Sequence, residues 1–139
     1  MKITVALLLA LLVVAGCGGA QEASFTPDQI IQAFQDAGLE ASSPSAMTAD
    51  DYGLAPYVGQ GVHFIIPSLC DDCGGRAYVG TRDEIDQLAA FYEEAGKASA
   101  LLFSWVFRTQ DGRGLVQING DLPEAEALRY KAVMEGIGQ

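Results

Sequence analysis

The chain has 139 residues, a formal net charge of −10 and 50% apolar residues, but these totals combine two different segments. The first 16 positions contain 13 apolar residues and a single charge, Lys2. The remaining 123 residues contain 56 apolar residues and carry 18 acidic against 7 basic side chains, a net charge of −11. This composition is sufficient for one domain with one core and excludes a disordered chain. Its acidity argues against nucleic-acid binding, which needs clustered Lys and Arg.

The N-terminal apolar run, residues 3–15, predicts an export signal. Lys2 supplies a short positive segment before the run, and Thr4 is its single polar member. Thirteen helical residues extend only about 20 Å, too little for a hydrocarbon core of about 30 Å. The length is typical of the apolar segment of a secretory signal peptide.

The run ends in Val14-Ala15-Gly16-Cys17, which resembles the lipobox of bacterial lipoproteins. The resemblance implies that a signal peptide of residues 1–16 is removed and that Cys17 becomes the lipidated N-terminus, held at the extracytoplasmic face of the cell membrane by its acyl chains. An ordinary cleaved signal peptide with an incidental cysteine is the alternative. Gly18 stands where Asp would favour inner-membrane retention, so an outer-membrane location is expected if the cell is Gram-negative.

A single domain is predicted over residues 25–139, after the lipidated Cys and a short tether at 17–24. Its first helix begins at a capping box, Thr26-Pro27-Asp28-Gln29, with Thr26 as the N-cap. Gly38 is expected to end this helix in the left-handed conformation. Between them lies an apolar stripe at helical spacing: Ile30, Ile31, Phe34 and Ala37.

Residues 40–61 predict mostly loop, with one helical turn capped at Thr48. Strands are predicted at 62–69 and 76–79, joined by a loop at 70–75. A second capping box, Thr81-Arg82-Asp83-Glu84, begins a helix that is expected to end at Gly96. Its predicted buried stripe is Ile85, Leu88, Ala89, Tyr92 and Ala95.

Residues 100–109 favour a strand, and Asp111-Gly112 predicts a two-residue hairpin turn after it. The turn sets the register, with the core face formed by Trp105 and Phe107 opposite Ile118 and Val116. The other face is mixed and is expected to be open or partly covered; it pairs Ser104, Val106 and Arg108 with Asn119, Gln117 and Leu115.

A last helix is predicted from the Asp-x-x-Glu pattern of Asp121 and Glu124 to Gly136, with a stripe of Ala125, Leu128, Ala132 and Val133. The elements therefore predict an α+β fold, in which an N-terminal helix precedes two ββα units. The expected sheet is four-stranded and largely antiparallel, with the helices on one face.

Several segments of the globular part resemble a group of small bacterial lipoproteins, some loosely labelled stress proteins, that has no established activity. The resemblance implies a lipoprotein and implies nothing catalytic. The segments are Met47-Thr48, Asp51-Tyr52-Gly53-Leu54-Ala55-Pro56, Ile66-Pro67-Ser68-Leu69, Gly74-Gly75-Arg76 and Val116-Gln117-Ile118-Asn119-Gly120-Asp121-Leu122-Pro123.

Cys70 and Cys73 flank Asp71 and Asp72 and form the main candidate site. Outside the cytoplasm, two thiols three positions apart favour a small structural disulfide; free thiols are a second interpretation. A metal site of Cys70, Cys73, Asp71 or Asp72 and His63 is a third, although one CxxC is only half of a zinc signature. A redox pair is disfavoured because no helix follows the cysteines and two carboxylates separate them.

His63 is the single histidine, and strand alternation places it on the face opposite Val62 and Phe64. No catalytic residues and no cofactor are predicted, because the chain has no Gly-x-Ser-x-Gly motif and no calcium-loop spacing. A weak cation site in the Asp71-Asp72 loop is left open.

These features predict a surface-tethered lipoprotein whose domain is a non-enzymatic binding or envelope-stress module. Its partners would be the membrane, through the lipid anchor, and an envelope ligand or protein. The acidic surface favours cationic or neutral partners. The alternative is a small envelope metal-binding protein or enzyme centred on Cys70, Cys73 and His63.

Overall fold

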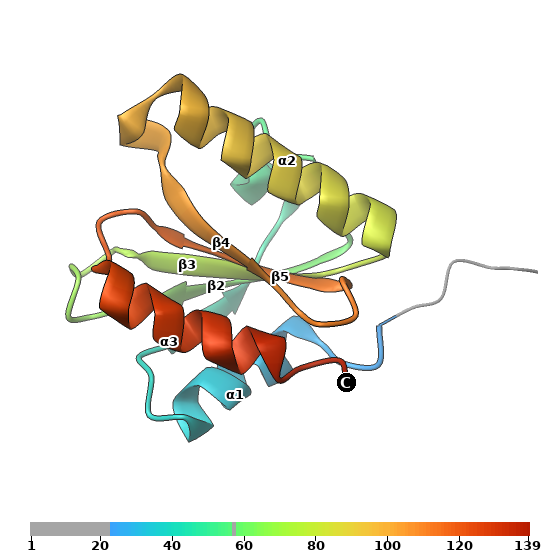
Figure 1. Ribbon diagram of the computed structural model, residues 1–139, viewed down its shortest axis with the longest axis horizontal. Helices are drawn as coiled ribbons and strands as arrows, with labels where there is room; N and C mark the ends of the chain where they lie inside the picture. The colour runs from blue at the N-terminus through green and yellow to red at the C-terminus, as the bar shows by residue number, and fades with distance from the viewer. Residues whose placement is uncertain (1–22, 57) are drawn as a thin grey trace, which may run out of the picture.

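A computed structural model describes residues 23–56 and 58–139, which form three α-helices, two short 3-10 helices and one five-stranded antiparallel sheet (Figure 1). The strand order in the sheet is β1-β2-β3-β5-β4. The elements in chain order are α1 (Pro27–Asp36), β1 (Ser42–Ala46), η1 (Ala49–Tyr52), β2 (Gln60–Ile65), β3 (Gly74–Val79), α2 (Arg82–Ala98), η2 (Ala100–Leu102), β4 (Ser104–Arg108), β5 (Gly114–Asn119) and α3 (Glu124–Glu135).

The export signal and the lipobox at Val14-Ala15-Gly16-Cys17 lie outside the described residues and stay predictions. Among the helices that the structure describes, none combines the length and the apolarity required to cross a bilayer.

Helix α1 begins and ends where its sequence predicts. The side chain of Thr26 accepts a hydrogen bond of 3.4 Å from the N–H of Gln29, and the Gln29 side chain accepts one of 2.8 Å from the N–H of Thr26. Gly38 follows the last turn with a φ of +74°, a conformation that glycine adopts without a Cβ penalty. Ile30 and Phe34 are fully buried against the sheet, whereas Ala37 is exposed.

The sheet has five strands and not the predicted four, because Ser42–Ala46 forms the edge strand β1. Four of its five residues are exposed, so no apolar alternation marks the strand in the sequence. Its backbone pairs with β2, with an irregularity between Ser42 and Ser45 that spans Pro44. An edge strand tolerates proline because one side needs no N–H donor. The side chains therefore gave no signal for a strand that backbone pairing creates.

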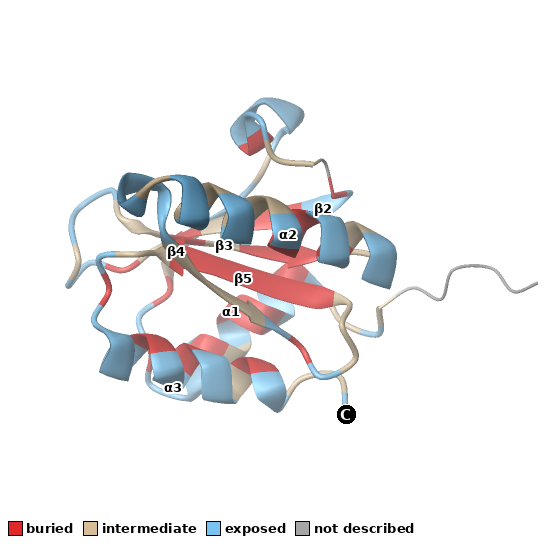
Figure 2. Ribbon diagram, turned by 45° about the horizontal axis from the view of Figure 1, so that its top comes forward, coloured by how far each residue is buried: buried red, intermediate tan, exposed pale blue. Residues whose placement is uncertain are grey.

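The helices cover both faces of the sheet, so the prediction that they share one face is wrong (Figures 1 and 2). Helices α1 and α3 pack on one face, around Phe34 and Ile118. Helix α2 packs on the other face, where Leu88 joins a cluster that contains Leu115. The physical reason is that strand β5 carries buried side chains on both sides, including Leu115 on the face that the sequence showed as mixed. That face is partly covered, as the prediction allowed.

The hairpin of β4 and β5 has the predicted register. Phe107 lies opposite Val116 and Trp105 opposite Ile118. The indole N–H of Trp105 donates a hydrogen bond of 2.9 Å to the carbonyl oxygen of Leu122, which fixes the edge strand to the segment that leads into α3.

Two helix boundaries differ from the prediction. Helix α2 continues past Gly96 to Ala98, because Gly96 faces Phe103 and provides a close contact instead of a stop. Helix α3 is capped by Pro123 and not by Asp121, whose N–H donates a 2.8 Å hydrogen bond to the side-chain oxygen of Asn119. Both differences arise from tertiary or turn contacts that compete with the local capping pattern.

The buried face of α3 is also rotated from the predicted one. Ala127, Tyr130 and Met134 are buried, while Leu128 is 47% exposed. Tyr130 orients the helix, since its ring packs edge-on against Phe34 at 5.0 Å and its hydroxyl donates a 2.7 Å hydrogen bond to the carbonyl oxygen of Glu40. Burial raises the pKa of Tyr130 to about 12, so the hydroxyl stays a donor at neutral pH.

Candidate ligand-binding groove

The two cysteines of the globular part form the disulfide that the sequence favoured, within the loop between β2 and β3. Their Cα atoms lie 5.0 Å apart. The loop is closed onto the sheet by a 2.8 Å hydrogen bond from the N–H of Ile66 to the carbonyl oxygen of Cys73. Because the two sulfurs are bonded to each other, neither cysteine is a free thiol.

The predicted metal set is not assembled. His63, Cys70, Asp72 and Cys73 line one groove, but Asp71 is not among the lining residues. Across residues 23–56 and 58–139, no three His, Cys, Asp or Glu side chains converge on a point that could hold a metal ion.

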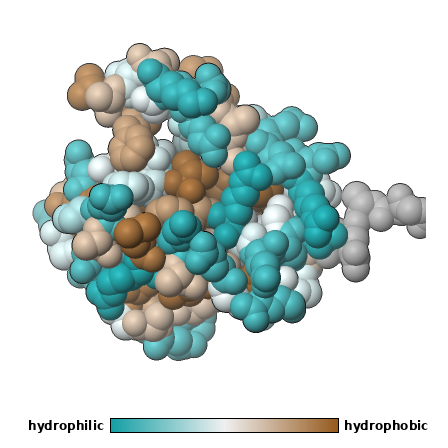
Figure 3. Space-filling view, viewed as in Figure 1, coloured by the Kyte–Doolittle hydropathy of each residue, from teal (hydrophilic) through white to brown (hydrophobic). Residues whose placement is uncertain are grey.

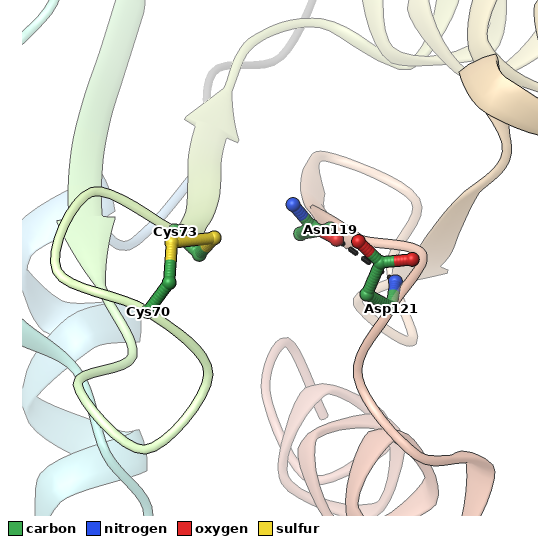
Figure 4. Close-up of a disulfide and its surroundings, with 4 residues drawn as sticks. All are labelled: Cys70, Cys73, Asn119 and Asp121. Carbon is green, nitrogen blue, oxygen red and sulfur yellow. Dashed lines mark hydrogen bonds between the residues drawn. A yellow bond between two sulfur atoms is a disulfide. The ribbon is translucent and has the colours of Figure 1, made fainter.

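The groove that these residues share has a volume of about 680 Å³ and lies on the α2 face of the sheet. The disulfide loop forms one wall, and the end of α2 with η2 forms the other. The turn after β5 borders it as well: Figure 4 shows the Cys70–Cys73 disulfide facing Asn119 and Asp121 across an open space. Its floor is the surface of β2, β3, β5 and β4.

The groove exists because α2 covers only part of this face. All three buried residues of α2, Ile85, Leu88 and Ala89, lie in its first half. From Phe91 onward no residue of the helix is buried, and Phe91, Tyr92 and Ala95 line the groove. A hydrogen bond of 2.6 Å between the hydroxyls of Tyr92 and Tyr78 ties the middle of the helix to β3. Beyond this tie the helix contacts Phe103 through Gly96 and borders the groove, but it buries no residue in the core.

The wall of the groove that the end of α2 and η2 form is apolar and exposed. Leu101 is 95%, Leu102 59% and Phe103 44% exposed, and all three line the groove. Figure 3 shows apolar surface over the outer end of the α2–η2 segment, at upper left, and a hollow beneath it. Position 120 in the turn after β5 requires glycine, because a Cβ there would lie 2.3 Å from the carbonyl oxygen of Phe103 in this wall.

The floor of the groove is polar, and a cross-strand row runs along it. His63 of β2 lies opposite Arg76 of β3, which lies opposite Gln117 of β5. Side chains on one face of paired strands are close neighbours. Ser104 and Asn119, paired across β4 and β5, lie one pair further along the same face.

Arg76 is the charged centre of this floor. Within the described part of the chain its guanidinium makes a single hydrogen bond, from Nη1 to the side-chain oxygen of Gln117, at a long 3.4 Å. The Nε of Arg76 is buried and has no partner. The hydroxyl oxygen of Ser104 is likewise buried and has no hydrogen-bond partner among the described residues. Among the residues that the structure describes, these are the two buried side-chain polar atoms without a hydrogen bond, and both of their residues line this one groove.

His63 adds no second charge to the floor. Burial, and then the neighbouring Arg76 guanidinium, lower the pKa of His63 below its ordinary 6.5, so its imidazole is neutral at pH 7. Asp51 acts weakly in the opposite direction, but its carboxylate is already held by the N–H and the hydroxyl of Thr48, at 2.6 and 2.9 Å.

The sequence singled out His63 and the cysteine loop, but it missed Arg76, Ser104, Gln117 and Asn119 as site residues. The available signal was the polar side of the predicted hairpin, which places Ser104, Gln117 and Asn119 on one face. Arg76 could be added only by knowing that β3 pairs with β5.

No family model, no curated protein and no solved structure matches this chain.

Proposed function

We propose that the protein is an exported, lipid-anchored lipoprotein whose single domain binds a small ligand in the groove between the disulfide loop and the end of α2. The observation that carries this proposal is the pair of unpartnered buried atoms, Arg76 Nε and Ser104 Oγ, in one groove. Buried polar groups in folded proteins are almost always hydrogen-bonded, and an exception calls for a reason. Both atoms lie just under the groove surface with almost no accessible area of their own, so a ligand bound above them supplies the missing partners when the two side chains turn toward it.

The size and lining of the groove support the same function. Its volume of about 680 Å³ lies within the range of about 300–1,000 Å³ that small-molecule sites occupy. Apolar walls around a few converging polar groups are the usual composition of such sites.

The geometry favours binding over catalysis. An activated serine needs a base in hydrogen-bond contact. The hydroxyl of Ser104 has no hydrogen-bond partner, although His63 lines the same groove. The groove therefore offers recognition groups without an activated nucleophile among them.

The anchor is tested by fractionation of cells that express the full chain or the Cys17→Ser variant. We expect the full chain in the membrane fraction, with acyl chains on Cys17 by mass spectrometry. The variant lacks the acylated thiol and should show neither the acyl mass nor the processed N-terminus. An unmodified Cys17 in the membrane-bound full chain would overturn the anchor.

The groove is tested by a pair of substitutions on α2. Ala95 lines the groove, whereas Ala90 is exposed and lies outside it. A mixture of small aromatic and aliphatic fragments is added to the full chain in neutral micelles and followed by the amide NMR signals. We expect shifts at groove residues such as Gly120, their loss in Ala95→Phe, and their persistence in Ala90→Phe. Shifts that persist in Ala95→Phe, or that avoid the groove, would contradict the proposal.

A further inference from the structure

Arg76 differs from every other basic side chain that the structure describes. Each of the others forms an ion pair with a carboxylate or a hydrogen bond to a backbone carbonyl oxygen: Arg82, Lys97, Arg108, Arg113, Arg129 and Lys131. Arg76 has only its long hydrogen bond to the neutral Gln117. Asp51 is close enough for Arg76 to contribute to lowering its pKa, but the Asp51 carboxylate is bound by Thr48 and forms no ion pair with Arg76. Within the described part of the chain, Arg76 is therefore the basic side chain most available to an anion.

We infer that the ligand of the groove is a small monocarboxylate with an aromatic or aliphatic body. Its carboxylate is bound by Arg76, and its body lies along the apolar wall that the end of α2 and η2 form, which includes Phe91 and Phe103. This inference rests on the proposed function and names the chemical class of its ligand. A planar guanidinium matches a carboxylate with two parallel hydrogen bonds.

The remaining charges of the groove select one negative charge and not two. His63 is neutral, so Arg76 is the single cation among the described residues that line the groove. Asp72 and Asp121 lie in the lining and are exposed. Their negative charges oppose a dianion such as a phosphate monoester more strongly than a monocarboxylate, while solvent screens their effect on the partly buried Arg76. The groove is thus an exception to the acidic surface, which by itself favours cationic or neutral partners.

The neutral groups of the floor fit the same ligand. The side-chain amide of Gln117, already in contact with Arg76, and that of Asn119 can donate to carboxylate oxygens. Ser104 can donate or accept at the far side of the floor. The exposed apolar side chains of Leu102 and Phe103 would lose water on contact with the body of the ligand, which favours an apolar one.

The test compares three probes with one body and different charge: 4-phenylbutyrate, uncharged 4-phenylbutyramide and cationic 4-phenylbutylamine. Each is titrated into the full chain in neutral micelles near pH 7, and affinity is read from groove amide signals. We expect the carboxylate to bind at least about tenfold more tightly than the amide, as a charge-assisted pair requires. The amine should bind most weakly.

Four variants give the role of each charge. Arg76→Met should remove the tenfold preference for the carboxylate, and Arg76→Lys, which keeps the charge but not the planar fork, should reduce it. Arg129→Met is the matched control, because this arginine lies on α3 and pairs with Glu126. Asp72→Asn should strengthen carboxylate binding about twofold to fivefold by removing a like charge.

The outcomes separate the inference from the proposed function. Equal affinity for carboxylate and amide, tighter binding of the amine, or an unchanged preference in Arg76→Met would overturn the carboxylate while leaving the groove a binding site. If none of the three probes shifts groove signals in the unaltered chain, the proposed function fails with it. Because the comparison of probes needs no substitution, it decides even if a variant fails to fold.

Discussion

Replacing Arg76 by Met should make the protein more stable, because the structure gives this arginine little to hold it in place. Its Nε is buried without a partner, and its one hydrogen bond, to Gln117, is 3.4 Å long. Methionine keeps an unbranched apolar stem of similar length and removes the charge and all the N–H donors. If removing Arg76 stabilises the fold, its place in the chain needs a reason other than stability, and the proposed ligand is that reason.

The magnitude follows from two opposing contributions. Removing the unpartnered buried donor should recover about 1–3 kcal/mol of desolvation free energy. Losing the hydrogen bond leaves the side-chain oxygen of Gln117, a residue that is only 9% exposed, without its donor, at a cost of about 1 kcal/mol. The expected net change is an increase of about 1 kcal/mol in the free energy of unfolding. The double variant Arg76→Met/Gln117→Leu removes the stranded oxygen and should gain more.

The assay is urea unfolding of the full chain at about 0.15 M salt, followed by the fluorescence of Trp105, the one tryptophan. Arg113→Met is the control, since this side chain is 15% exposed and its Nη1 lies 3.7 Å from the carboxylate of Asp111. It should lower the free energy of unfolding by about 1–3 kcal/mol. If Arg76→Met lowers stability by more than about 1 kcal/mol, Arg76 is a structural residue and the reasoning that links it to a ligand is refuted.

Three further predictions test other parts of the structure. Replacing Cys70 and Cys73 by Ser removes the disulfide that closes a four-residue loop and should lower the free energy of unfolding by about 2 kcal/mol in urea. If adding a reductant to the unaltered protein leaves its urea midpoint unchanged, this prediction is contradicted. Because the folded-state pKa of His63 is lowered, the unfolded chain binds its proton first. The contribution of His63 to the free energy of unfolding is therefore fully present above pH 6.5 and is lost as the pH falls from there toward the pKa of His63 in the folded state. The free energy of unfolding should therefore fall less between pH 7.5 and pH 5.5 in His63→Gln than in the unaltered protein. An equal fall in the two proteins would count against this prediction. Met134→Ala should cost about 2–5 kcal/mol by calorimetry, whereas Leu128→Ala, at a half-exposed position, should cost less than about 1 kcal/mol; the opposite ranking would restore the stripe that the sequence predicts.

The features that the sequence predicts correctly are local in the chain. The capping box at Thr81 closes between residues three apart, with a 2.7 Å hydrogen bond from its N–H to the carboxylate of Glu84. The turn at Asp111 and Gly112 sets the pairing of Trp105 with Ile118, because strand register follows from the turn between the strands. Interactions of this range need no knowledge of the remaining chain.

The features that the sequence could not give depend on distant partners. Strand β1 is a strand because β2 offers its edge, and nothing in Ser42–Ala46 favours extension on its own. The buried face of α3 is fixed by the contact of Tyr130 with Phe34, nearly a hundred positions earlier in the chain. Two candidate stripes on one helix can be ranked only when the surface against which the helix packs is known.

The groove is the clearest case of this dependence. Arg76 and Ser104 come from β3 and β4, which do not touch in the sheet and are joined through β5. Their common position follows from the strand order and from the divergence of α2, which no short motif encodes. The cysteine pair, by contrast, predicted its disulfide from spacing alone, and the disulfide loop lines the groove, which the spacing did not predict.

The direction of α2 also decides how the domain presents itself to its surroundings. Ala23, where the described chain begins, lines one surface hollow together with Thr81 and Glu84 at the start of this helix, whereas the groove is lined by residues from its second half. Seventeen residues of helix are about 25 Å long. The described chain therefore begins near the end of α2 opposite the groove, so immobilising the protein by its N-terminus should leave the proposed ligand site accessible from solution.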